Sequence, residues 1–78
     1  IQHLYTMKKT KKIKIKINGK KKSIDNDSYL LELINELKIP IKKVAIEFNR
    51  EIVDKKKIKK IKLRNNDVIE IVHFIGGG

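Results

Sequence analysis

The order of sequence patterns predicts a small α+β domain in which one main helix covers one face of a mixed sheet. Near the start, residues 12–17 read KIKIKI, an alternation typical of a strand buried on one face only. A single stretch with helical periodicity follows at residues 30–37. The later apolar segments alternate again, so the chain returns to strands after its helix.

The first alternating segment begins a β-hairpin. One face of this strand carries isoleucines and the other carries lysines. Asn18-Gly19 comes next, and both residues tolerate the positive φ that a two-residue type I′ turn requires. We expect the chain to return through residues 20–24 as the second strand.

The polar run at residues 25–28 predicts the N-cap of the helix, because such side chains accept hydrogen bonds from free backbone N–H groups. Helix capping then explains the presence of Asp25 and Asp27 at these positions. The apolar stripe of the helix consists of Leu30, Leu33, Ile34 and Leu37, widened by Leu31. Pro40 ends the helix at or before Ile39, which gives a length of about ten residues.

Strands account for most of the remaining chain. Residues 44–49 alternate and predict a third strand, Ile52-Val53 predicts a small fourth one, and residues 68–75 predict the last. The lysine-rich stretch 54–63 is expected to be a loop or a short turn of helix. Its anchors are Ile58, Ile61 and Leu63. This order fits a β-grasp arrangement, a mixed four- to five-stranded sheet packed on one main helix.

Composition excludes several functions. A chain of 78 residues seldom encloses a deep active site, and without cysteine it has no disulfide, thiolate zinc site or cysteine nucleophile. Two histidines are too few for a histidine-based metal centre, and no apolar stretch is long enough to span a membrane. Lysine supplies 18 of the 20 positive charges behind the net charge of +11, and isoleucine occurs 15 times. This bias is typical of AT-rich coding sequence, so we interpret the lysines as a solvated coat.

Three of the four glycines are the last three residues, Gly76, Gly77 and Gly78. Either they form only a flexible tail, or they let the backbone enter a narrow slot where any Cβ would clash. In the second case the α-carboxylate of Gly78 is the group delivered. We therefore divide the chain into a flexible basic lead-in at 1–12, a β-grasp domain at 13–75 and a flexible glycine tail at 76–78.

The segments VAIEFNREIV (Val44 to Val53) and NDVIEIVHFIGGG (Asn66 to Gly78) resemble the ThiS-type sulfur carrier proteins of thiamine biosynthesis, which are ubiquitin-like β-grasp proteins. The resemblance runs from about Ile13 to Gly78. Two turns depart from the family pattern. Asn49-Arg50 stands where Asn-Gly is common, and Asn66-Asp67 stands where Gly-Asp is common. Both changes keep an asparagine that tolerates turns.

The resemblance implies a carrier that is not itself an enzyme. An E1-like (ThiF-type) enzyme would use ATP to adenylate the Gly78 carboxylate, and sulfur from a persulfide, supplied by a donor such as a cysteine desulfurase, would displace AMP. A ThiG-type thiazole synthase would take the sulfur from the resulting thiocarboxylate. The carrier would bind no cofactor or metal of its own. The implied compartment is the cytoplasm, or the plastid stroma if the gene is organellar.

The last strand presents two faces. Alternation directs Ile69 and Ile71 into the core and directs Val68, Val72 and Phe74 to the other side. Exposed apolar side chains beside a reactive terminus predict a docking surface for partners. The alternative is that they pack under a loop such as residues 54–63. His73, which has no partner at useful spacing, is interpreted as a histidine on the strand surface.

Other functions stay open at this point. The small subunit of molybdopterin synthase shares the fold, the tail and the activation chemistry, and a ubiquitin-like protein conjugated to lysines is a further possibility. A basic RNA-binding β-grasp module belongs to a different class. It would need exposed aromatic side chains among the lysines, and residues 8–22 and 55–64 contain none.

Overall fold

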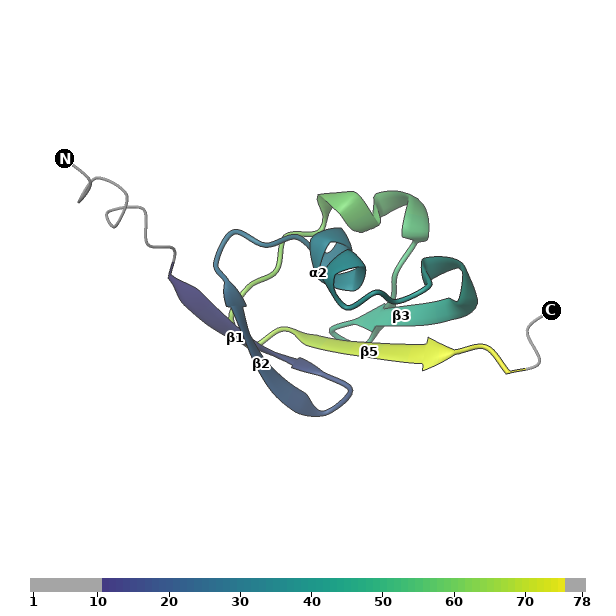
Figure 1. Ribbon diagram of the computed structural model, residues 1–78, viewed down its shortest axis with the longest axis horizontal. Helices are drawn as coiled ribbons and strands as arrows, with labels where there is room; N and C mark the ends of the chain where they lie inside the picture. Colours follow the sequence, from purple (N-terminus) through teal and green to yellow (C-terminus); the bar gives the residue numbers. More distant parts are fainter. Residues whose placement is uncertain (1–10, 76–78) are drawn as a thin grey trace.

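The computed structural model describes residues 11–75, which form one five-stranded sheet with a single α-helix on one face (Figure 1). The strands lie in the order β2-β1-β5-β3-β4. Their bounds are β1 Lys12–Ile17, β2 Lys20–Asp25, β3 Val44–Phe48, β4 Glu51–Ile52 and β5 Val68–His73. The α-helix is α2, Leu30–Glu36, and two short 3-10 helices are η1, Ile41–Lys43, and η2, Lys55–Lys60. The predicted β-grasp architecture is confirmed.

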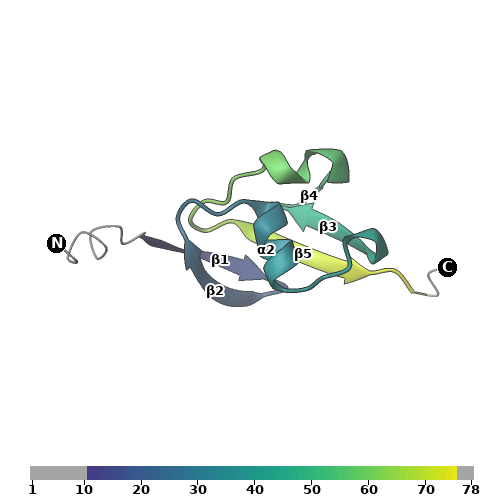
Figure 2. The same cartoon turned by 45° about the horizontal axis from the view of Figure 1, so that its top comes forward.

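The last strand lies at the centre of the sheet, between the first and the third (Figure 2). It runs parallel to β1 and antiparallel to β3, so the sheet is mixed. The two edge pairs, β1 with β2 and β3 with β4, are antiparallel hairpins. Everything that extends β5 toward the C-terminus therefore leaves from the middle of the sheet.

The first hairpin forms as its alternation predicts. Asn18 and Gly19 have φ of 49° and 83°, the positive values that a type I′ turn needs. The second strand continues one residue further than expected, to Asp25, which faces Lys12 in the register. Lys12 Nζ lies 2.6 Å from Asp25 Oδ1. The carbonyl of Lys11 accepts a hydrogen bond from the Asn26 N–H, so Lys11 and Lys12 take part in the first hairpin, and residues 1–10 of the predicted lead-in lie outside the described residues.

The predicted helix N-cap is wrong. The helix begins at Leu30 with Tyr29 as its N-cap, and the Tyr29 N–H donates to Glu32 Oε1 at 2.7 Å. Asp25 and Asp27 instead pair with lysines, and Asp27 Oδ1 lies 3.2 Å from Lys62 Nζ. Asp25 is the last residue of β2 and Asp27 lies in the connection that follows, and each carboxylate pairs with a lysine from another segment.

The helix is also shorter than expected, with seven residues. Lys38 has φ of 58°, and its N–H donates to Asn35 O, while the Ile39 N–H donates to Ile34 O. These two bonds form a Schellman motif, which ends the helix before Pro40 can act. Leu37 is consequently exposed at the helix C-cap, whereas Leu30, Leu33 and Ile34 are buried as predicted.

The core fills the space between α2 and the sheet. Its most deeply buried side chains are Ile15, Leu30, Ile34, Val44, Ile46, Leu63 and Ile69. The small fourth strand exists but ends at Ile52, and the last strand ends at His73, two residues earlier than expected. The lysine-rich stretch forms η2 beside α2 (Figure 1), with Ile58 and Leu63 buried as its predicted anchors.

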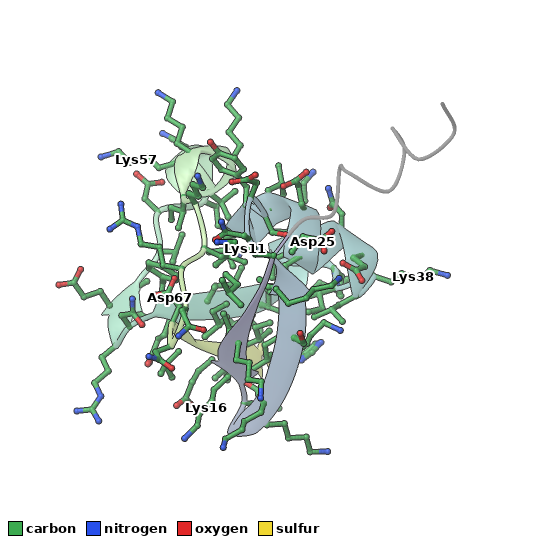
Figure 3. The ribbon with its side chains drawn as sticks, turned by 90° about the vertical axis from the view of Figure 1, so that its left-hand side faces the viewer. Lys11, Lys16, Asp25, Lys38, Lys57 and Asp67 are labelled. Carbon is green, nitrogen blue, oxygen red and sulfur yellow. The ribbon has the colours of Figure 1, made fainter. Side chains whose placement is uncertain are left out.

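Lysines are spread over the surface outside β3, β4 and β5, and the side chains of Lys38 and Lys57 extend away from the body of the molecule (Figure 3). Among the described residues only two lysines, Lys22 and Lys55, are partly buried. The predicted solvated coat is therefore confirmed as a matter of placement.

Two asparagines attach the hairpin turns to β5 from opposite sides. Asn18 Oδ1 accepts from the Ile71 N–H at 2.7 Å, and Asn18 Nδ2 donates to the Ile71 carbonyl. Asn49 Oδ1 accepts from the Val68 N–H at 2.8 Å, and Asn49 Nδ2 donates to Asp67 Oδ1. The buried Asp67 carboxylate also accepts from the Arg64 N–H at 2.7 Å. These bonds fix β5 at the centre of the sheet.

Candidate docking face and tail base

The three C-terminal glycines, Gly76, Gly77 and Gly78, lie outside the described residues. The structure describes the base of the tail, where β5 ends. The Phe74 N–H donates to the Lys43 carbonyl at 2.9 Å, which extends the pairing of β5 with the β3 side by one bond. Ile75 follows with 99% of its surface exposed. The tail therefore leaves the fold at Phe74.

The side chains of β5 divide between two faces as the alternation predicts. Ile69 and Ile71 are 0% and 7% exposed and belong to the core. Val72 and Phe74 are 56% and 53% exposed; alternation places Val72 on the opposite, outer face of the sheet and directs Phe74, just beyond the end of β5, to the same side. Val68 is only half-buried, so it contributes less open surface than expected. The burial of Ile69 and Ile71 and the exposure of Val72 and Phe74 agree with the alternation, and the docking role of Val68, Val72 and Phe74 stays a prediction.

One lysine of the 54–63 stretch contacts this face. Lys55 Nζ lies 5.4 Å from the centroid of the Phe74 ring, within the range of a cation–π interaction. The 54–63 stretch therefore reaches the Phe74 ring through Lys55, while about half of the Phe74 surface remains open. The contact connects the base of the tail to η2.

The outer face contains a further apolar residue that the sequence analysis did not select. Ile52 in β4 is 69% exposed and lies opposite Glu47 in the β3–β4 register. Its neighbour Val53 is buried, so alternation already implied that Ile52 points outward. We use the term outer apolar face for Ile52, Val68, Val72 and Phe74.

The two turns that depart from the family pattern keep a left-handed backbone. Asn49 and Arg50 have φ of 51° and 73°, and Asn66 has φ of 74°. Asparagine adopts this region more easily than most residues, whereas arginine does so at a cost. The asparagine in each turn therefore preserves the turn geometry that the departures had put in question.

His73 occupies the last position of β5 and is exposed, as expected for a histidine on the strand surface. Within residues 11–75, no group of three histidine, cysteine, aspartate or glutamate side chains could hold a metal ion. No helix in that part of the chain is long and apolar enough to cross a membrane. The compartment remains a prediction.

Comparison with known proteins gives a consistent result. The chain is 37% identical over 65 residues to the sulfur carrier protein ThiS of Bacillus subtilis. The aligned region covers 82% of this chain and 98% of that protein. It is 38% identical over 66 residues to a thiazole synthase of Paramagnetospirillum magneticum, covering 85% of this chain. The chain spans only 20% of the length of that thiazole synthase.

The fold comparison agrees with the sequence comparison. The crystal structure of the thiamine biosynthesis protein ThiS from Geobacter metallireducens superposes with a TM-score of 0.74 and 26% identity, covering 85% of this chain and all of that one. The sequence model of the ThiS family matches residues 15–78, which includes the outer apolar face and the glycine tail. The chain therefore belongs to the ThiS family.

Proposed function

We propose that this chain is a sulfur carrier for thiazole formation in thiamine biosynthesis and that Gly78 carries the sulfur. The observation that supports this most strongly is the family match, which extends through the glycine tail to residue 78. Such a carrier is not an enzyme, because it supplies the reacting carboxylate and no catalytic group. The resemblance of a larger thiazole synthase to this chain supports a thiazole synthase as its sulfur acceptor.

The proposed chemistry begins with adenylation by an E1-like partner. A Gly78 carboxylate oxygen attacks the α-phosphorus of ATP, and pyrophosphate leaves. A free carboxylate is a poor electrophile, and the acyl-adenylate gives it a good leaving group. The terminal sulfur of a persulfide, from a donor such as a cysteine desulfurase, then attacks the acyl carbon and AMP leaves. A thiol must finally cleave the remaining S–S bond to release the thiocarboxylate.

The placement of the tail suits this use. Ile75 is almost fully exposed, so the last backbone bond to the fold is that of Phe74. Three residues beyond Ile75 reach up to about 10 Å when extended. Glycines allow this segment to enter a slot too narrow for side chains. The domain can therefore remain outside the partner's active site while the carboxylate enters it.

The first experiment alters the tail and leaves the domain unchanged. Deleting Gly78, or adding one residue after it, should abolish ATP–pyrophosphate exchange by the cognate adenylating enzyme, because the reacting carboxylate is displaced. The thermal unfolding temperature should not change. Exchange at the wild-type rate with the extended tail would contradict the proposal.

The intact mass of the protein from its native host should reveal an oxygen-to-sulfur exchange at the C-terminus. Transfer of that sulfur to a thiazole synthase would distinguish this function from that of the molybdopterin synthase subunit.

The second experiment tests the predicted docking role of Phe74. An aromatic anchor at the centre of an interface contributes about 2 kcal/mol or more, roughly thirtyfold in affinity. Phe74→Ala should therefore weaken binding to the adenylating enzyme and to thiazole synthase by about that factor, measured by titration calorimetry. Folding stability should fall by about 1 kcal/mol, because the ring is half-exposed and its contact with Lys55 is weak.

Ile71→Ala is the matched control on the core face of the same strand. It should lower the free energy of unfolding by about 2–5 kcal/mol, because it leaves a cavity beneath α2. Its effect on binding should arise only from the unfolded fraction. If Phe74→Ala unfolds the protein as severely as Ile71→Ala, the outer apolar face is not a docking surface.

A further inference from the structure

Charge is divided between the two halves of the sheet. Strands β1 and β2 contain six lysines and one aspartate. Strands β3, β4 and β5 contain Glu47, Glu51 and Glu70 and no lysine or arginine. Lysine makes up 18 of the 78 residues, and the exposed positions of these three strands carry none. A coat of lysine that reflects only coding bias would not stop at the boundary between β1 and β5.

Two of these glutamates face each other on the outer face. Glu47 and Glu70 are direct partners in the β3–β5 register. The next pair in that register, Ile46 with Ile71, is buried, so the glutamates point away from the core. Like charges directly opposite each other on antiparallel strands destabilise the pair. Within residues 11–75 the ion pairs are those of Asp25 and Asp27, so neither glutamate is neutralised by a lysine.

Apolar side chains flank this acidic pair on the β4 side and along β5, while Lys16 of β1 lies beside Val68 at the edge of the face. Ile52 lies next to Glu47 on the β4 side, and Val72 follows Glu70 by two residues on the same face. Continuing along β5 by another two residues leads to Phe74 and the base of the tail. The acidic pair therefore lies within the outer apolar face and not on a separate surface.

The acidic pair within the outer apolar face limits which kind of molecule can bind there. RNA is excluded because phosphates would meet two carboxylates. A second copy of the chain is disfavoured, because a two-fold contact would place this face against itself, and the three strands supply no lysine or arginine to match the glutamates. A small cation would leave Ile52 and Val72 in water. A different protein with an apolar surface and a basic side chain at its centre satisfies both features.

We propose that the outer apolar face docks the adenylating partner through a contact in which Glu47 and Glu70 together bind one arginine side chain of that partner. This inference rests on the proposed function, since the face leads directly to the tail that such a partner would process. A guanidinium presents five N–H donors in a planar fork and can serve two carboxylates at once. Binding would convert a repulsive pair in the free carrier into a neutralised one and so favour the correct partner.

The test compares Glu70→Gln and the double variant Glu47→Gln/Glu70→Gln with Glu36→Gln. Glu36 is exposed on α2, so its variant changes the net charge by the same one unit as Glu70→Gln while leaving the outer face intact. Titration calorimetry with the cognate adenylating enzyme should show a dissociation constant about tenfold higher for Glu70→Gln than for wild type. The increase should be greater for the double variant. Glu36→Gln should bind like wild type.

Two further readouts separate recognition from a structural role. The outer-face variants should unfold at the same or a higher temperature than wild type, because a repulsion has been removed, and the salt dependence of their dissociation constant should be smaller. Wild-type affinity in the double variant, or a lower unfolding temperature, would overturn the inference. ATP–pyrophosphate exchange by the wild-type carrier would still support the proposed function in that case, whereas a wild type that neither binds nor supports exchange would overturn both.

Discussion

The two hairpin turns of this protein have nearly the same backbone but different sequences. Asn18-Gly19 and Asn49-Arg50 both have positive φ at their two central residues, at 49° and 83° and at 51° and 73°. The first has the residues a type I′ turn prefers, and the second places an arginine where glycine is expected. The comparison shows that the common asparagine, and not the glycine, is what the two turns require.

Each asparagine serves its turn in two ways. It tolerates the left-handed backbone, and it reaches across to β5. The backbone N–H of Asn18 donates to the Ile69 carbonyl at 2.9 Å, and that of Asn49 donates to the Val68 carbonyl at 2.7 Å. With the side-chain bonds described above, each turn makes three hydrogen bonds toward the start of β5 or its first residues. Tertiary bonds of this kind can hold a strained residue such as Arg50 in place.

The largest expected difference between the turns comes from replacing each asparagine with glycine, which keeps positive φ accessible and removes only the side chain. Asn49→Gly should lower the free energy of unfolding by about 2–3 kcal/mol, because the buried Asp67 carboxylate loses a donor. Asn18→Gly should cost about 1 kcal/mol, because its lost bonds join neutral groups. Urea denaturation measures both. Equal losses would mean that the two asparagines act only as turn residues.

A smaller effect is expected at the second turn position. Arg50→Gly should raise the free energy of unfolding by about 1 kcal/mol, because the left-handed backbone is strained for arginine and the side chain is exposed. Gly19→Ala should lower it by a similar amount. No atom lies within 4 Å of a Cβ added at Gly19, so the cost would be conformational alone.

Thermal unfolding of Arg50→Gly and Gly19→Ala compares the second position of the two turns directly. Opposite shifts of similar size would show that the two turns differ only in the strain at this one position. A loss of stability in Arg50→Gly would show instead that the arginine side chain supports the β3–β4 hairpin.

Several features of this protein follow from local sequence alone. The strict alternation of residues 12–17 determines which side chains of β1 are buried, because a strand has a period of two. The same rule separates Ile69 and Ile71 from Val72 and Phe74, and exposed Ile52 from buried Val53. These predictions succeed because they depend on periodicity within one strand and on nothing at a distance.

Other features were decided by the tertiary structure. The N-cap is Tyr29 and not the polar run, and Asp25 and Asp27 pair with Lys12 and Lys62, of which Lys62 is far away in the sequence. The opposition of Glu47 and Glu70 appears only when β3 and β5 are aligned. The double use of Asn18 and Asn49 likewise requires β5 to lie between the two hairpins. Sequence patterns specify the faces of each element, and only the packing of distant segments determines which polar groups meet, because hydrogen bonds and ion pairs depend on a few ångströms of separation.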